Sequence, residues 1–167
     1  MRQRRHYKTF EHSTALEWQP RRLARAMVPD APPLTMSPPV QLGGEPGRWT
    51  PEELLLAAVE SCTLFTFLAE AQQRGLTPVA WRSSAEGIVA RDADGRFRFV
   101  HVVVRPVVDV KDEEDARRAR EVLEAVEQHC FVGNSVHPEP RVEARVVVVR
   151  RAAPPGPPEA GVEGPSS

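Results

Sequence analysis

The chain has 167 residues, 41% of them hydrophobic, which is enough to build one core, so a single domain is expected. Its 22 basic and 23 acidic residues leave a formal net charge of -1, which gives no general electrostatic reason to bind nucleic acid or an anionic membrane. The basic start, Met1 to Arg5, leads into no apolar stretch of signal-peptide length, and we see no run that would span a bilayer. A cytoplasmic location is therefore expected.

Two strands are predicted near the N-terminus. The segment from about Tyr7 to Leu16 alternates as a strand does, and Arg22 to Val28 can pair with it across a turn at Gln19-Pro20. The following segment, Pro29 to Pro46, holds six prolines together with Gly43-Gly44. It is predicted to cross the surface as an irregular loop, and loops of that length are often functional.

The first helix has a clear start signal, because Thr50 can cap it, Pro51 suits its first position and Glu53 completes a capping box. Gly75 offers a C-terminal stop. Apolar or small residues recur at three- and four-residue intervals at Leu55, Ala58, Val59, Cys62, Phe65, Thr66 and Ala69. Other apolar residues (Leu54, Leu56, Leu64, Phe67 and Leu68) occupy the remaining sides, so a central helix buried nearly all round is predicted.

A hairpin, a second helix and a last strand follow. The segments Arg82 to Arg91 and Arg96 to Val108 flank a turn that contains Gly95. Acidic residues 112–115 suit a helix N-terminus, and an apolar stripe follows at Ala116, Ala119, Leu123, Val126 and Cys130. The last strand is predicted over Val142 to Arg150. This order predicts an α+β fold, with an antiparallel sheet and two long helices. We expect a flexible basic arm over 1–6, a domain over 7–150 and a disordered Pro/Gly-rich tail over 151–167.

The two cysteines, Cys62 and Cys130, lie in or at the end of these two helices, on the predicted core side. In a reducing compartment such cysteines are more often free, catalytic or redox-active than permanently bridged. A core cysteine taken alone is nevertheless most often a packing residue. The residues that flank the two cysteines must decide between these roles.

The flanking residues carry a family resemblance. The run GGEPGRWTPEELLLAAVESC, which ends at Cys62, and the run HCFVGNS around Cys130 resemble the OsmC/Ohr family. Both cysteines fall where that family has its reactive pair, and the order of elements agrees over 7–150. In the better-known members the second cysteine is commonly followed by proline. This chain has Phe131 there, which fits a broader OsmC-like branch.

The resemblance implies a cysteine peroxidase that reduces organic hydroperoxides in an oxidative stress response. Cys62 would be the attacking thiolate and Cys130 the resolving thiol, with no cofactor or metal and with a dithiol reductant such as a lipoyl group. General thiol chemistry agrees with this cycle. A thiolate that attacks a peroxide becomes a sulfenic acid, and a second thiol condenses with it to a disulfide before further oxidation.

The resemblance also implies how Cys62 is activated. Burial tends to raise the pKa of a cysteine, so a nearby cation is needed to stabilise the thiolate. The family uses an arginine from the N-terminal strands or loop, held by a glutamate ten residues before the first cysteine. Glu52 occupies that position. We favour Arg25 or Arg22 as the arginine, and Arg48 remains open.

The helical rise places Glu52 about 15 Å along the axis from Cys62, too far for a shared site in one straight helix. Either the helix is broken, or Glu52 serves the Cys62 of a second chain. The resemblance implies an intertwined homodimer with sites at the interface, and a homodimer is expected. Glu52 could equally do no more than favour the helix N-terminus.

Alternatives to a peroxidase have less support in the sequence. One alternative of a different class is a non-catalytic OsmC-like module that binds an apolar or acyl ligand at the dimer interface. The cysteines would then be packing residues. His129 and His137 suggest a metal site with Cys130, with Cys62 as a further ligand. Adjacent residues such as His129 and Cys130 point to different sides of a helix, however, and the sequence has no second close ligand pair, so zinc is not expected. A Cys-His hydrolase would lack a residue that orients the histidine.

Overall fold

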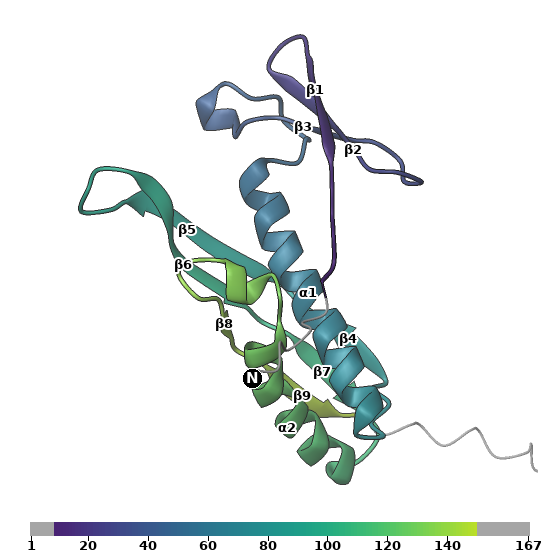
Figure 1. Cartoon of the computed structure of the whole chain (residues 1–167). Helices are drawn as coiled ribbons and strands as arrows, with labels where there is room; N and C mark the ends of the chain where they lie inside the picture. Colours follow the sequence, from purple (N-terminus) through teal and green to yellow (C-terminus); the bar gives the residue numbers. More distant parts are fainter. Residues whose placement is uncertain (1–8, 150–167) are drawn as a thin grey trace, which may run out of the picture. The chain divides into compact units, whose positions relative to one another are not determined.

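The structure is a computed structural model that describes residues 9–149 (Figure 1). The chain divides into two compact units, Met1–Ala58 and Val59–Ser167, and each is described by itself. The predicted arm over 1–6 and the predicted tail over 151–167 lie outside the described residues. The domain predicted over 7–150 stays a prediction.

The first unit contains an antiparallel sheet of three strands, β1 (Ala15–Gln19), β2 (Leu23–Met27) and β3 (Leu34–Met36), in that order. The predicted hairpin is confirmed, although its first strand lies closer to the turn than the alternating pattern indicated. The predicted irregular loop over 29–46 is wrong in part, because β3 pairs with β2 and a 3-10 helix, η1 (Val40–Leu42), follows. The short run Leu34–Met36 lies between prolines, which hid its strand character in the sequence.

The helix α1 (Pro51–Gln73) begins as predicted. The Thr50 N–H donates to Glu53 Oε2 at 2.9 Å, and the Glu53 N–H donates to Thr50 Oγ1 at 3.2 Å, which confirms the capping box. The helix ends before Gly75, whose φ of 65° is the left-handed conformation that glycine tolerates. The N–H of Leu76 then bonds the Ala71 carbonyl at 2.9 Å.

The second unit holds the rest of α1, the helix α2 (Glu113–His129) and six strands. The strands are β4 (Ala80–Arg82), β5 (Ala85–Arg91), β6 (Phe97–Val104), β7 (Val107–Val110), β8 (Arg141–Val142) and β9 (Arg145–Val148). They form two sheets with the orders β4-β7-β9 and β5-β6-β8. The predicted hairpin is confirmed as β5 and β6, and the α+β class is confirmed.

Two predicted strands are each divided in the structure. The strand predicted over 96–108 ends at Val104 and resumes at Val107 in the other sheet, because Pro106 has no N–H with which to continue a ladder. The last strand is likewise two strands. β8 pairs in parallel with β6, and β9 in parallel with β7, so the antiparallel arrangement predicted for the sheet holds for the hairpins but not for these two strands.

The core of the second unit lies where α2 packs against β7 and β9 (Figure 1). The residues that fill it are Phe67, Ala71, Leu76, Val108, Val110, Ala116, Ala119, Val122, Leu123 and Val126. Phe67 is fully buried, and its ring centroid lies 4.9 Å from that of Trp81. The helix α2 begins where the acidic cluster predicted it, with Asp112 as the N-cap that accepts the Asp115 N–H at 2.8 Å. Its predicted apolar stripe is confirmed.

The face that α1 buries differs from the predicted one. The buried residues are Val59, Thr63, Phe67 and Ala71, whereas the side chains of Phe65 and Leu68 are 65% and 40% exposed. The expectation that the helix is buried nearly all round is therefore wrong for the single chain. Because apolar residues lie on every side of α1, the sequence pattern does not indicate which face of the helix is buried. In the single chain only one stripe of the helix is covered.

The apolar composition of α1 also bears on the expectation that no run of the chain would span a bilayer. By length and hydropathy α1 could cross a membrane, with a mean hydropathy of 1.6 over an 18-residue window. The core helix of a soluble protein passes the same test, so this is weak evidence for a membrane span. The sequence-based statement that no run is long enough is nevertheless wrong.

Candidate thiol site

The structure brings the two cysteines together. Cys62 lies on α1, and Cys130 follows α2 directly as its C-cap. Both are free thiols, and their side chains hydrogen bond each other. Cys130 is only 4% exposed, whereas Cys62 is partly buried. The pair is therefore reachable through Cys62.

A short turn after α2 holds both sulfur atoms, and we call residues 130–135 the thiol turn. The Val132 N–H donates to Cys62 Sγ at 3.5 Å, and the Gly133 N–H donates to Cys130 Sγ at 3.3 Å. The turn continues as the 3-10 helix η2 (Gly133–Ser135). A Cβ at residue 133 would lie 3.1 Å from Cys130 Sγ, so this approach favours glycine.

Two polar side chains close the thiol turn. Asn134 Nδ2 donates to the Gln128 carbonyl at 2.9 Å, and Ser135 Oγ donates to the Phe131 carbonyl at 2.8 Å. They satisfy carbonyl groups at and just beyond the end of α2, where such groups lack helical partners. Both residues therefore help to terminate the helix.

The two thiols have pKa values that shift in opposite directions. Burial raises the pKa of Cys62, but hydrogen bonds from the Val132 N–H, the Cys130 thiol, the Thr66 side chain and the Phe131 N–H outweigh it and lower this pKa. Burial and the hydrogen bond to Cys62 raise the pKa of Cys130. Of the two thiols, Cys62 is thus the one that loses its proton more readily, and Cys130 is the one that keeps it. Since hydrogen bonds suffice for the direction of this shift, a cation is not needed to explain it.

We predict that alkylation separates the two thiols by pH. Iodoacetamide reacts with the thiolate form, so Cys62 should remain reactive at a pH where an ordinary cysteine is protonated, because its pKa is lowered. Cys130 should react only above the ordinary range, because its pKa is raised. Peptide mass spectrometry after short pulses at a series of pH values assigns each thiol. Equal pH profiles for Cys62 and Cys130 would contradict the assignment.

The other predicted site residues lie in the first unit. Arg25 and Arg48 line one cavity of about 470 Å³, with Gln19, Leu23, Pro33 and Thr35. Arg22 instead donates to the Leu42 carbonyl at 2.7 Å. Glu52 has a buried Oε2 atom without a hydrogen-bond partner among the described residues.

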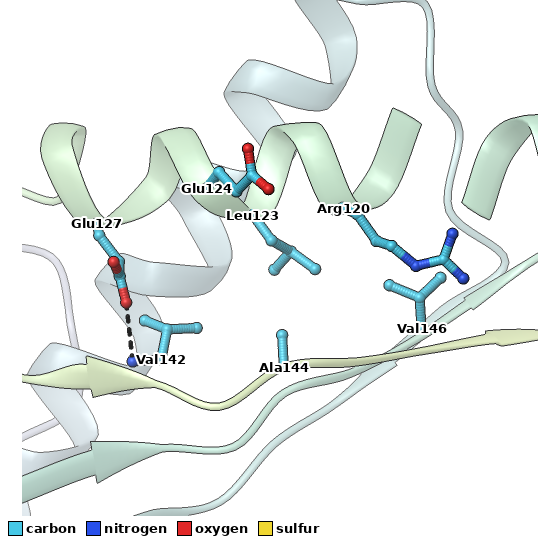
Figure 2. Close-up of a pocket in the computed structure, with 7 residues that line it drawn as sticks. All are labelled: Arg120, Leu123, Glu124, Glu127, Val142, Ala144 and Val146. Atoms are coloured by element: carbon cyan, nitrogen blue, oxygen red, sulfur yellow. Dashed lines mark hydrogen bonds between the residues drawn. The ribbon is translucent and has the colours of Figure 1, made fainter. Parts of the chain in front are cut away.

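A groove in the second unit lies between α2 and the β8–β9 segment (Figure 2). It has a volume of about 390 Å³; Val142, Ala144 and Val146 line it from the β8–β9 segment, and Leu123 projects into it from α2. Arg120 stands at one end in Figure 2, and Glu124 and Glu127 line the rest of the α2 side. A Glu127 carboxylate oxygen accepts the Val142 N–H at 3.2 Å. The groove contains neither cysteine, so it is separate from the thiol site.

The model of the OsmC-like protein family matches residues 43–145, which include both cysteines and the thiol turn. This match covers more than half of the chain. The chain belongs to the OsmC family.

The chain is also similar to individual proteins from bacteria. A Bacillus subtilis protein, the uncharacterized YmaD, is 29% identical over 106 residues, which is 61% of this chain and 69% of that protein. An OsmC-like protein of unknown function from Vibrio cholerae has a similar structure, with a TM-score of 0.73 at 21% identity, covering 81% of this chain and 99% of that one.

An organic hydroperoxide resistance protein from Elizabethkingia anophelis is also similar, with a TM-score of 0.68 at 16% identity, covering 86% of this chain and all of that one. At these identities the solved structures show a shared OsmC fold.

Sequence reasoning missed several groups at the thiols of this OsmC chain. Thr66, one helical turn after Cys62, hydrogen bonds its thiol. Thr63 is buried, hydrogen bonds Cys130 and donates its hydroxyl to the Val59 carbonyl at 2.9 Å. The four-residue spacing of Cys62 and Thr66 could have indicated the first contact. The backbone amides of the thiol turn carry no signal in the sequence.

Proposed function

We propose that this protein is a cysteine peroxidase that reduces organic hydroperoxides, with Cys62 as the attacking thiolate and Cys130 as the resolving thiol. The observation that carries the proposal is the hydrogen-bonded thiol pair with opposite pKa shifts. A lowered pKa provides the thiolate that attacks peroxide oxygen. A raised pKa keeps Cys130 protonated until it is needed.

The proposed cycle consists of oxidation of Cys62, resolution by Cys130 and reduction of the disulfide. The Cys62 thiolate attacks one peroxide oxygen, the O–O bond breaks, and the alkoxide leaves and takes up a proton as the alcohol. Cys62 is then a sulfenic acid. The Cys130 thiol attacks its sulfur, a disulfide forms and water leaves. A dithiol reductant, such as a lipoyl group, reduces the disulfide and is itself oxidised to a disulfide.

We also propose an intertwined homodimer. The continuity of α1 from Pro51 to Gln73, without a break between Glu52 and Cys62, supports this proposal. A buried carboxylate oxygen without a partner is costly, which supports an additional group at Glu52. In the proposed dimer Glu52 holds Arg25 (or Arg22), and this arginine stabilises the thiolate form of Cys62 of the partner subunit. The exposed apolar side chains Phe65 and Leu68 would supply interface area. Light scattering that finds only monomer at micromolar concentration would contradict it.

Known relatives support the choice of substrate class. Solved structures with the same fold include organic hydroperoxide resistance proteins from Elizabethkingia anophelis and Legionella pneumophila. The exposed Phe65 and Phe131, on α1 and in the thiol turn, offer apolar contacts to an organic peroxide. We also propose a cytoplasmic location, where thiols stay reduced between turnovers.

The experiment is a titration of the reduced protein with cumene hydroperoxide. One equivalent should consume both thiols and produce a Cys62–Cys130 disulfide, which peptide mass spectrometry identifies. Hydrogen peroxide should react more slowly at the same concentration, because it has no apolar group to bind. If both thiols survive a stoichiometric dose of cumene hydroperoxide, the peroxidase proposal falls.

The second candidate is a non-catalytic module that binds an apolar or acyl ligand at a dimer interface. The exposed apolar side of α1 favours it, since Phe65 is 65% exposed in the single chain. This candidate expects the thiols to survive the same peroxide dose. It also expects a fluorescent acyl probe to bind a Cys62→Ser variant as tightly as the unmodified protein.

A further inference from the structure

Three residues with polar side chains lie on one side of α1 at four-residue spacing, namely Cys62, Thr66 and Glu70. Residues four apart on a helix are neighbours on its surface. Thr66 hydrogen bonds the Cys62 thiol, and Glu70 Oε1 lies 2.8 Å from His129 Nδ1. His129 is the last residue of α2 and immediately precedes Cys130. The side of α1 that carries Cys62 therefore also contacts the residue that leads into Cys130.

The contact between Glu70 and His129 is built into the packing of the two helices. The Glu70 side chain is only 15% exposed, and a carboxylate withdrawn from water is stable only when it is paired. Its second oxygen, Oε2, lies 3.7 Å from the Arg74 guanidinium, which is a looser contact on the same helix. The imidazole is thus the close partner. A histidine at the end of a helix also interacts favourably with the helix dipole when it is protonated.

We propose that Glu70 and His129 are a positioning pair, which fixes the end of α2 against α1 and so sets the rate at which Cys130 resolves the Cys62 sulfenic acid. This inference rests on the proposed peroxidase function. In the step concerned, the Cys130 thiol attacks the sulfenic sulfur, the S–S bond forms, the S–O bond breaks, and the hydroxyl leaves as water with the thiol proton. The rate of such a step depends on how well the two sulfurs are held together.

The pair has a specific kinetic consequence. Neither residue is among the groups that hydrogen bond the Cys62 thiol and shift its pKa, so Glu70→Ala and His129→Ala should leave the first oxidation by cumene hydroperoxide unchanged. Disulfide formation should slow by about tenfold in each, as expected for the loss of a charged hydrogen bond. The double variant should be no slower than either single one, because both changes remove the same contact. Glu70→Gln, which keeps a hydrogen-bonding group, should have an intermediate rate.

Stopped-flow mixing separates the two steps, and mass spectrometry counts disulfide and over-oxidised sulfinate at Cys62. The slower variants should accumulate more sulfinate at the same peroxide dose. Glu124→Ala, which removes an exposed carboxylate from the middle of α2, is the matched control and should behave as the unmodified protein. Additive slowing in the double variant, or resolution at the unmodified rate in Glu70→Ala and His129→Ala, would overturn the pairing.

A second measurement needs no peroxide. Equilibration in glutathione redox buffers gives the effective concentration of Cys130 at Cys62, which should fall about tenfold in Glu70→Ala and His129→Ala if the pair positions the thiols. An unchanged effective concentration in the alanine variants would overturn the inference. If an alanine variant is poorly stable, Glu70→Gln can be measured in the same way. If the unmodified protein consumes no peroxide while the effective concentration still falls in Glu70→Ala and His129→Ala, the proposed function fails and the positioning of the two thiols by the pair stands.

Discussion

Replacing Cys62 by serine should abolish peroxide turnover. A hydroxyl at this position stays protonated at neutral pH, so the group that attacks the peroxide is lost, and we expect the rate to fall by roughly three orders of magnitude or more. The hydrogen bonds from the thiol turn stabilise a thiolate, and they cannot make serine comparably nucleophilic. The measurement is the loss of cumene hydroperoxide in the presence of an excess of dihydrolipoamide.

Replacing Cys130 by serine is the matched comparison, because it changes the partner thiol by the same single atom. This variant should react once at Cys62 and then oxidise further to the sulfinate, since no second thiol traps the sulfenic acid. Mass spectrometry should find two added oxygens on the Cys62 peptide. Equal turnover by the unmodified protein and both serine variants would show that neither thiol has the proposed role.

Replacing Phe67 by alanine should cause a large loss of stability. Its side chain is fully buried between α1 and the core of the second unit, and its ring contacts Trp81. A phenylalanine-to-alanine change at such a site leaves a cavity and lowers the free energy of unfolding by about 3–5 kcal/mol. Urea denaturation followed by tryptophan fluorescence measures this difference.

Phe97→Ala is the control for the stability prediction. Phe97 is 67% exposed on β6, where the Arg91 guanidinium lies 4.7 Å from its ring centroid. Removing the ring should cost less than about 1 kcal/mol, the size of an exposed cation–π contact. A Phe67→Ala variant that loses no more stability than Phe97→Ala would show that the core is not centred on Phe67.

The parts of the fold that local chemistry determines could be predicted from the sequence. Thr50 and Glu53 are close in the chain and cap each other, so the start of α1 follows from neighbouring residues. The side of α1 that packs could not be predicted, because its apolar residues surround the helix and the tertiary contacts choose among them. The division of the last strands likewise depends on which sheet each segment joins.

The thiol site shows the same limit. Cys62 and Cys130 could be paired from their flanking residues, and the structure brings them together. The donors that lower the pKa of Cys62 could not be found in this way, because two of them are backbone N–H groups, which every residue except proline has. Their role comes from the path of the thiol turn, and that path depends on the packing of α2.

One of these two backbone groups is the N–H of Phe131. Its N–H is among the groups that lower the pKa of Cys62, while its side chain is 71% exposed. A proline at this position, which the family resemblance of the sequence would suggest, would have no hydrogen to donate. With phenylalanine at this position, the turn supplies one more N–H donor to the Cys62 sulfur. The hydrogen bond to Cys62 comes from the backbone, so it does not depend on the exposed ring.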